Sequence, residues 1–178
     1  MTYRPKLDKI YFRMGDYMKI RSNALLVARI LLCVLTLSLI VFIFSNSIQT
    51  ASVSSVSSGR VMNFLNSICT TLNLNFVFTQ EIVRTLAHFC EFGLLGVLSQ
   101  LTFISFFGTK AKALISSVVA SVSTALVDEC IQLFSDGRAF QLSDLVIDFA
   151  GSLLGIVGVF LIALLIYNQK NKVSEKES

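Results

Sequence analysis

The sequence has few charged residues, one proline, one histidine and no tryptophan among its 178 residues. Charged side chains make up 15% of the chain and hydrophobic ones 54%. This composition excludes a water-soluble domain and requires that lipid cover most of the surface. The four cysteines have no CxxC or CxxH spacing, so the usual cysteine-based zinc and redox motifs are absent. The mean hydropathy of +0.73 predicts one small integral membrane domain.

Four segments have the composition and length of membrane-spanning helices, which need about 20 apolar residues per crossing. They comprise residues 24–44, 82–107, 111–134 and 142–167. We therefore predict an all-α fold, a small polytopic membrane helix bundle with four transmembrane helices within a domain of residues 23–167. Arg29 lies near the end of the first segment, where its long side chain can reach the interface.

The distribution of lysine and arginine predicts the orientation of these spans. Seven basic residues lie at or before Arg29, two lie in the connection after residue 107, and three lie in the tail of residues 168–178. The other two connections carry only Arg60 and Arg138. By the positive-inside rule, both termini are expected in the cytoplasm of a multi-pass protein, and the tail is expected to be a charged cytoplasmic segment.

Basic residues could also indicate nucleic-acid binding, because the isoelectric point is about 9.0. The topology already accounts for them, however, and no recognition motif accompanies the charge. No nucleic-acid partner is predicted. Residues 1–22 combine basic and apolar residues at helical spacing, which is typical of a basic amphipathic helix on an anionic inner leaflet. A solvated basic segment that only sets the topology is an equally good interpretation.

Residues 45–80 form the long connection and are expected outside the cell as an external loop. The first part of this loop is rich in serine, and apolar residues recur between Val61 and Phe78. These features favour a flexible linker followed by an interfacial anchor. The alternative is a lid over whatever lies beneath.

Ionisable residues occur where the hydropathy predicts membrane, at a cost of several kcal/mol each in hydrocarbon, so we expect them to be paired, hydrated or functional. Helical geometry places those of the second span within roughly a 60° arc, and places acids on one face of the third and fourth spans. The orientation brings all three faces to the outer leaflet. The predicted binding set comprises Arg84, His88, Glu91, Asp128, Glu129, Gln132, Arg138, Asp144 and Asp148.

Charge within this set does not balance. Five carboxylates face two arginines, which leaves three uncompensated negative charges, or two if His88 is protonated. Either some acids keep a proton, or a metal ion or a ligand amine supplies the missing positive charge. The ligand spacing is unspecific, so neither a metal site nor a cofactor is predicted.

Small and hydroxylated residues mark the predicted helix contacts. Glycines at positions 151, 155 and 158 share a face with the acids of the last span, within roughly 80°, and would let a neighbouring helix approach closely. We therefore assign Gly151, Gly155 and Gly158 to helix packing. Ser117, Ser121 and Thr124 are expected to form interhelical hydrogen bonds.

The ordered motifs RTLAHFCEF, DECIQLF and GRAFQLSDLVIDFAGSLLG, together with FSNS after the first span, resemble the VanZ-like family of bacterial membrane proteins over about residues 36–165. Thr85, Phe92 and Ile131 depart from the residues common in that family. The resemblance implies a location in the bacterial cytoplasmic membrane. The founding member is associated with teicoplanin resistance, and the resemblance implies no particular enzymatic activity.

Three functions compete. The first is a cell-envelope protein whose outer polar cavity binds membrane lipids through their head groups, such as a lipid-linked cell-wall precursor or a glycolipid, with an effect on glycopeptide susceptibility. The second is a membrane-embedded hydrolase or transferase, with His88, Glu129 or Asp144 as candidate catalytic residues. The third is an ion-coupled transporter, which four spans would support only as a homo-oligomer.

Overall fold

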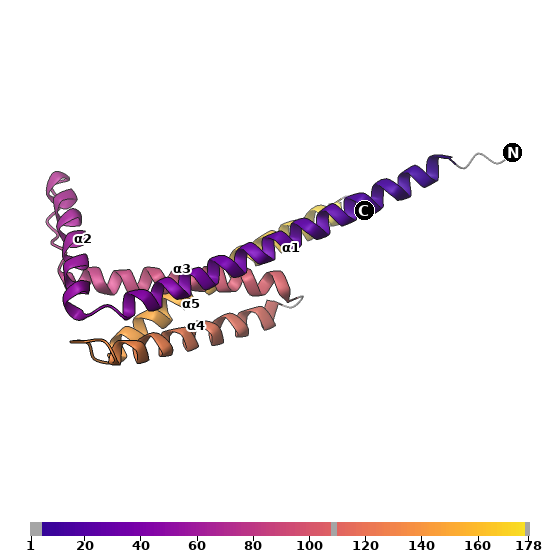
Figure 1. Ribbon diagram of the computed structural model, residues 1–178. Coiled ribbons are helices and arrows are strands. Elements are labelled where there is room, and N and C mark those ends of the chain that lie inside the picture. The colour runs from indigo at the N-terminus through magenta and orange to yellow at the C-terminus, as the bar shows by residue number, and fades with distance from the viewer. Residues whose placement is uncertain (1–4, 108–109, 177–178) are drawn as a thin grey trace.

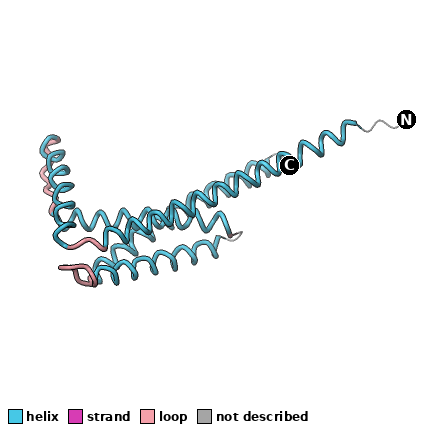
Figure 2. The backbone as a smooth tube through the Cα atoms, viewed as in Figure 1, coloured by secondary structure: helices cyan, strands magenta, loops and turns pink. Residues whose placement is uncertain are grey.

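The computed structural model describes residues 5–107 and 110–176, and these form five helices joined by short connections (Figure 1). The helices are α1 (Pro5–Ser47), α2 (Ala51–Thr71), α3 (Gln80–Phe106), α4 (Lys110–Leu133) and α5 (Leu142–Lys176). The described ranges contain no strand, as the smooth tube in Figure 2 also shows. The predicted all-α class is confirmed.

Four of the helices contain a stretch that is long and apolar enough to cross a membrane. These stretches are Ser22–Ser47, Gln80–Phe106, Ala111–Leu133 and Leu142–Ile166, each within a few residues of a predicted span. Large apolar side chains such as Leu37, Val41, Ile115 and Leu154 are exposed along them. Because lipid is as apolar as these side chains, a bundle with this surface is suited to a membrane.

Helix α3 lies at the centre of the bundle and contacts each of the other four helices. Phe92 and Leu95 of α3 are fully buried against Ile43 of α1 and Ala125 of α4. The core is therefore built around the middle of α3. The first turns of α3 and α5 and the last turn of α4 lie at one end of the bundle, the end from which α2 rises (Figure 1).

Helices α3 and α5 approach each other through glycine. A Cβ atom at Gly151 would overlap the carbonyl oxygen of Phe89, and one at Gly155 would overlap the carbonyl oxygen of Gly93. Gly151 and Gly155 therefore lie at a backbone-to-backbone contact. Gly93 and Gly96 supply its other side, and a Cβ atom at Gly96 would overlap the carbonyl oxygen of Ser152. Gly158, which the sequence groups with them, does not lie there: a Cβ atom at this position would meet nothing within 4 Å. Tilted helices separate on either side of their crossing, and Gly158 lies beyond it.

The hydroxyl groups of α4 also differ from the prediction. Ser117, Ser121 and Thr124 are buried between helices, but Ser117 Oγ donates to Ala113 O of its own helix at 2.8 Å, and Thr124 Oγ1 donates to Ala120 O, also of α4. Serine and threonine readily bond the carbonyl one turn back when the opposing helix offers no acceptor. These two residues therefore add no interhelical bond.

Serine-rich residues that suggested a flexible linker are helical in α2, which stands at a steep angle to the four spans (Figure 1). Thr50 caps the helix, and its side chain accepts from Val53 N. The extended return to α3 is fixed by Asn66, whose Nδ2 donates to Phe78 O at 3.0 Å and whose Oδ1 accepts from Phe78 N at 2.7 Å. One side chain thus holds residues 72–79 along α2.

Asn66→Ala is expected to make residues 72–79 about ten times more sensitive to chymotrypsin, because two hydrogen bonds contribute about 1–3 kcal/mol together. Limited proteolysis of the purified protein measures this rate. Asn63→Ala is the matched control, since Asn63 is an exposed residue of the same helix. Equal cleavage rates in the two variants would show that Asn66 does not hold the return segment.

Arg29 of the first span is half-buried and lies against the last turn of α3. Arg29 Nε donates to Ser105 O at 2.8 Å, and its guanidinium lies over the ring of Phe106. Arg29 therefore ties α1 to the end of α3. Helix α1 is continuous from Pro5 to Ser47, so no break separates the basic N-terminal residues from the first span. The side chains of residues 1–21 and 167–178 lie outside the described part, so the amphipathic segment and the charged tail stay predictions.

Candidate functional site

Two polar pairs connect α3 to α5, one helical turn apart, and are called the two rungs below. Arg84 Nη2 lies 3.0 Å from Asp144 Oδ2, and one turn further along both helices His88 Nδ1 lies 3.2 Å from Asp148 Oδ1. The two helices run in the same direction from the α2 end, so residues four apart on one meet residues four apart on the other. The Arg84 side chain is 36% exposed, whereas that of Asp148 is fully buried.

Asp128 connects α4 to the end of α1. Ser47 Oγ donates to its Oδ1 at 2.6 Å, and Gln132 Nε2 donates to its Oδ2 at 3.0 Å. The backbone carbonyl of Ser47 in turn accepts from Ser135 Oγ. Asp128, Gln132 and Ser47 are all buried. The carboxylate is therefore held in a fixed orientation inside the bundle.

The two glutamates lie on different sides of this cluster. Glu91 Oε1 accepts from Asn46 Nδ2 of α1 at 3.1 Å. Glu129 Oε2 accepts from the backbone nitrogen of Gln141 at 2.9 Å, and Glu129 Oε1 is buried without a partner in the described part of the chain. Glu129 therefore fixes the loop that enters α5, while Glu91 faces α1.

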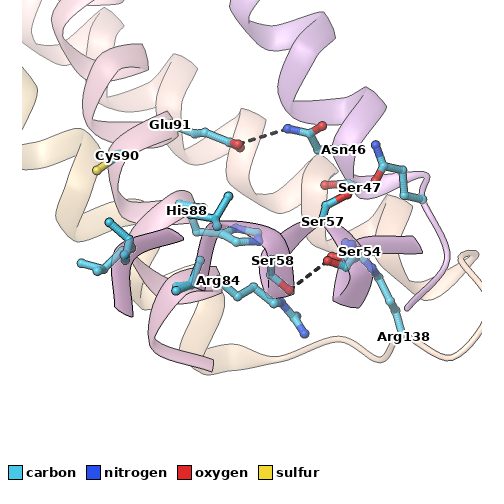
Figure 3. Close-up of a pocket in the computed structure, with 16 residues that line it drawn as sticks. Asn46, Ser47, Ser54, Ser57, Ser58, Arg84, His88, Cys90, Glu91 and Arg138 are labelled. Atoms are coloured by element: carbon cyan, nitrogen blue, oxygen red, sulfur yellow. Dashed lines mark hydrogen bonds between the residues drawn. The ribbon is translucent and has the colours of Figure 1, made fainter. Parts of the chain in front are cut away.

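A cavity of about 390 Å³ lies beneath α2, as Figure 3 shows. Its size falls within the range of small-molecule sites, roughly 300–1,000 Å³. Its polar lining comes from the ends of α1 and α3, from α2 and from the loop before α5: Asn46, Ser47, Gln49, Ser54, Ser57, Ser58, Arg84, His88, Glu91 and Arg138. Val61, Leu65, Val83 and Leu86 add an apolar side.

The structure thus divides the predicted site. Four of the nine predicted residues line this cavity, namely Arg84, His88, Glu91 and Arg138. A second cavity of about 130 Å³ adjoins Arg84, His88 and Asp144. The remaining predicted residues, Asp128, Glu129, Gln132 and Asp148, are buried behind the cavities. The single polar site that the sequence suggested is therefore a cavity backed by a buried acidic cluster.

Arg138 has no ion-pair partner among the described residues, and its Nε is buried without an acceptor. Burial and the nearby Arg84 guanidinium lower the pKa of Arg138. Two cations thus share one cavity wall, and only Arg84 has a carboxylate bound to it. An anion in the cavity would find donor groups already in place.

The sequence profile of the VanZ/LLP1 family matches residues 31–165, well over half of the chain. The chain belongs to the VanZ/LLP1 family. No curated protein and no solved structure matches it. The matched range includes α2, both rungs, the cavity and the buried acids, so this site lies wholly within the VanZ/LLP1 domain.

The three residues that depart from the VanZ-like pattern differ in how deeply they are buried in the protein. Phe92 is fully buried in the core, Thr85 lines the smaller cavity and Ile131 is half-buried on α4. None of them lines the larger cavity. The three departures therefore leave the lining of the larger cavity of this VanZ/LLP1 protein unchanged.

Sequence reasoning missed the contributions of α1 and α2 to the VanZ/LLP1 site. Asn46 and Ser47 bind two of the predicted acids, and Ser54, Ser57 and Ser58 line the cavity from α2. Asn46 and Ser47 belong to the FSNS motif, and the position of this motif directly after a span could have indicated them. The α2 serines gave no such indication, because a serine-rich stretch is equally typical of a linker.

Proposed function

We propose that this protein binds the anionic head group of an envelope lipid in the cavity beneath α2. The observation that carries the proposal is the pair Arg84 and Arg138 on one cavity wall, with Arg138 free of any ion pair among the described residues. Guanidinium groups bind phosphate through paired, charge-assisted hydrogen bonds. The serine hydroxyls of α2 would donate hydrogen bonds to the remaining phosphate oxygens or to a sugar.

An apolar surface beside the cavity supports a lipid rather than a free anion. Val61 and Leu65 line the cavity from α2, and Phe64 and Ile68 of the same helix are exposed. A helix with one apolar face is suited to lie at a lipid interface. The head group would thus enter beneath α2 while the acyl or prenyl chain stays in the bilayer.

The basic residues at the opposite end of the bundle support an orientation for this site. We infer that both termini are cytoplasmic and that the cavity opens at the outer leaflet of the bacterial cytoplasmic membrane. Lipid-linked cell-wall precursors and glycolipids would be accessible there. Retention of such a lipid would change the surface that teicoplanin meets, which is how an effect on glycopeptide susceptibility would arise.

One observation favours a second function, a hydrolase or transferase acting on the same lipid. His88 lines the cavity and contacts the buried Asp148 at 3.2 Å, the arrangement of a general base with an orienting carboxylate. Of the other candidate catalytic residues, Glu129 lines neither cavity and Asp144 is paired with Arg84. His88 is the residue on which an enzymatic function would depend.

The binding proposal is tested with the protein in nanodiscs, using a C15 prenyl phosphate and the matching prenyl alcohol as probes. We expect the phosphate to bind at least about tenfold more tightly than the alcohol, and Arg138→Gln to reduce this difference by about tenfold or more. A hydrogen bond between charged groups contributes about 1.5–3 kcal/mol, which corresponds to a factor of about 10–150. Release of inorganic phosphate in the same samples would establish the enzymatic alternative.

Arg60→Gln is the matched control, because Arg60 is exposed on α2 and does not line the cavity. Arg138→Gln should leave the melting temperature of the ligand-free protein unchanged or higher, since the folded state lowers the pKa of Arg138 and so disfavours its cation. Equal affinity for phosphate and alcohol in the wild-type protein would refute the proposal.

A further inference from the structure

Three helices bring potential metal ligands together behind the cavity. His88 of α3, Asp128 of α4 and Asp148 of α5 each offer one ligand atom, and these atoms lie within 4.8 Å of one another. Both carboxylates are fully buried. We propose that this cluster binds one divalent cation, of the class of Zn²⁺.

The charge of the cluster supports a divalent ion. Two buried carboxylates face one imidazole, so protonation of His88 would still leave one negative charge. A divalent ion with a neutral imidazole gives a net charge of zero. Neither arginine of the cavity is paired with these two carboxylates: Arg84 is bound to Asp144, and Arg138 has no ion-pair partner among the described residues. Buried charges are stable when they are paired or coordinate a metal, and a cation here satisfies that requirement.

An unpartnered atom is the second, independent observation. Asp148 is fully buried, and its Oδ2 accepts no hydrogen bond within the described part of the chain. Asp148 Oδ1 lies 3.2 Å from His88 Nδ1. In a tetrahedral zinc site, neighbouring ligand atoms lie about 3.3–3.6 Å apart, given metal distances of about 2.0–2.2 Å. This pair already has nearly that spacing.

Asp128 completes the set and is oriented by its neighbours. Ser47 and Gln132 donate one hydrogen bond to each of its oxygen atoms. Each carboxylate oxygen has two lone pairs, so both bonds can remain while one oxygen binds the ion. Hydrogen-bonded carboxylates of this kind are usual around protein metals. The mixture of imidazole and carboxylate fits Zn²⁺ better than Ca²⁺, which takes six to eight oxygen ligands.

The position of the ion would link it to the cavity above. His88 lines both cavities, whereas the two carboxylates lie behind them. A cation there would add positive charge beneath the arginine wall without occupying the cavity. The inference is nevertheless independent of the lipid proposal, because it depends only on the three ligands.

Zinc binding tests the inference on full-length protein dialysed against EDTA and then titrated with Zn²⁺ alone. We expect one equivalent to bind and to raise the melting temperature. Asp148→Asn, which keeps the side-chain shape, should bind at least tenfold more weakly and lose that rise, because a neutral amide is a poor ligand. Asp136→Asn is the matched control, since Asp136 is an exposed acid that lies outside the three-residue set and lines neither cavity.

Three results would overturn the inference: no zinc bound at about 100 µM free ion, equal binding by wild type and Asp148→Asn, or an equal loss in Asp136→Asn. Should Asp148→Asn fail to fold, His88→Gln replaces it and the same zinc-dependent rise in melting temperature decides. Zinc binding is measured without any lipid probe. Its failure would therefore leave the head-group proposal standing, and the reverse also holds.

Discussion

Gly155→Ala is expected to lower the melting temperature of the protein by about 5–10 °C. The new Cβ atom would overlap the carbonyl oxygen of Gly93 and approach Val97 N, both of which are backbone atoms that cannot turn away. The two helices would have to separate, and overpacking of this kind costs about 1–3 kcal/mol. Thermal unfolding in detergent, followed by circular dichroism, measures the change.

Gly158→Ala provides a matched control one turn further along α5. A Cβ atom at Gly158 meets nothing within 4 Å, and alanine has a higher helix propensity than glycine. This variant should melt at the wild-type temperature or above it. A similar loss of stability in both variants would mean that helix propensity or lipid contact, and not the α3–α5 approach, determines the effect.

The close α3–α5 contact also determines the geometry of the two polar pairs, Arg84–Asp144 and His88–Asp148. Arg84 and His88 face Asp144 and Asp148 only if both helices keep the same register and direction. Gly93 and Gly151 lie on the turns that follow the rungs. Small residues let membrane helices approach closely, so glycine packing in the middle of the bundle positions the polar groups at its end.

The sequence predicted the spans well because hydrocarbon permits few alternatives: each crossing needs about 20 apolar residues with all backbone groups bonded internally. It failed for the first part of α2, where serines between Ala51 and Gly59 obscure the helical period. The helix forms nonetheless, with Thr50 as its cap. Gly158 shows a second limit, because a glycine face on one helix does not reveal where a partner crosses it.

The candidate site was predictable as a set of residues but not as a geometry. Helical phase placed Arg84, His88 and Glu91 on one face of a span, and they do line a common cavity. Which acid meets which base depends on the register between two helices, and a single sequence does not contain that register. The division between a cavity and buried acids such as Asp128 also required the position of α2.

A charge swap separates the structural role of Arg84 from its role in binding. Arg84→Glu would place a carboxylate against Asp144, where a guanidinium now lies 3.0 Å away. Attraction between α3 and α5 becomes repulsion in a partly buried site. We expect the yield of folded, detergent-stable protein to fall at least about tenfold, as measured by size-exclusion chromatography with a fluorescent fusion.

The double variant Arg84→Glu/Asp144→Arg restores an ion pair and should recover most of that folded yield. It should not recover binding of the prenyl phosphate, because position 144 adjoins the smaller cavity and does not line the cavity beneath α2. Affinity should stay about 10–100-fold below wild type, the loss expected for one charge-assisted contact. Recovery of both properties would instead show that Arg84 acts only through the ion pair and does not contact the head group.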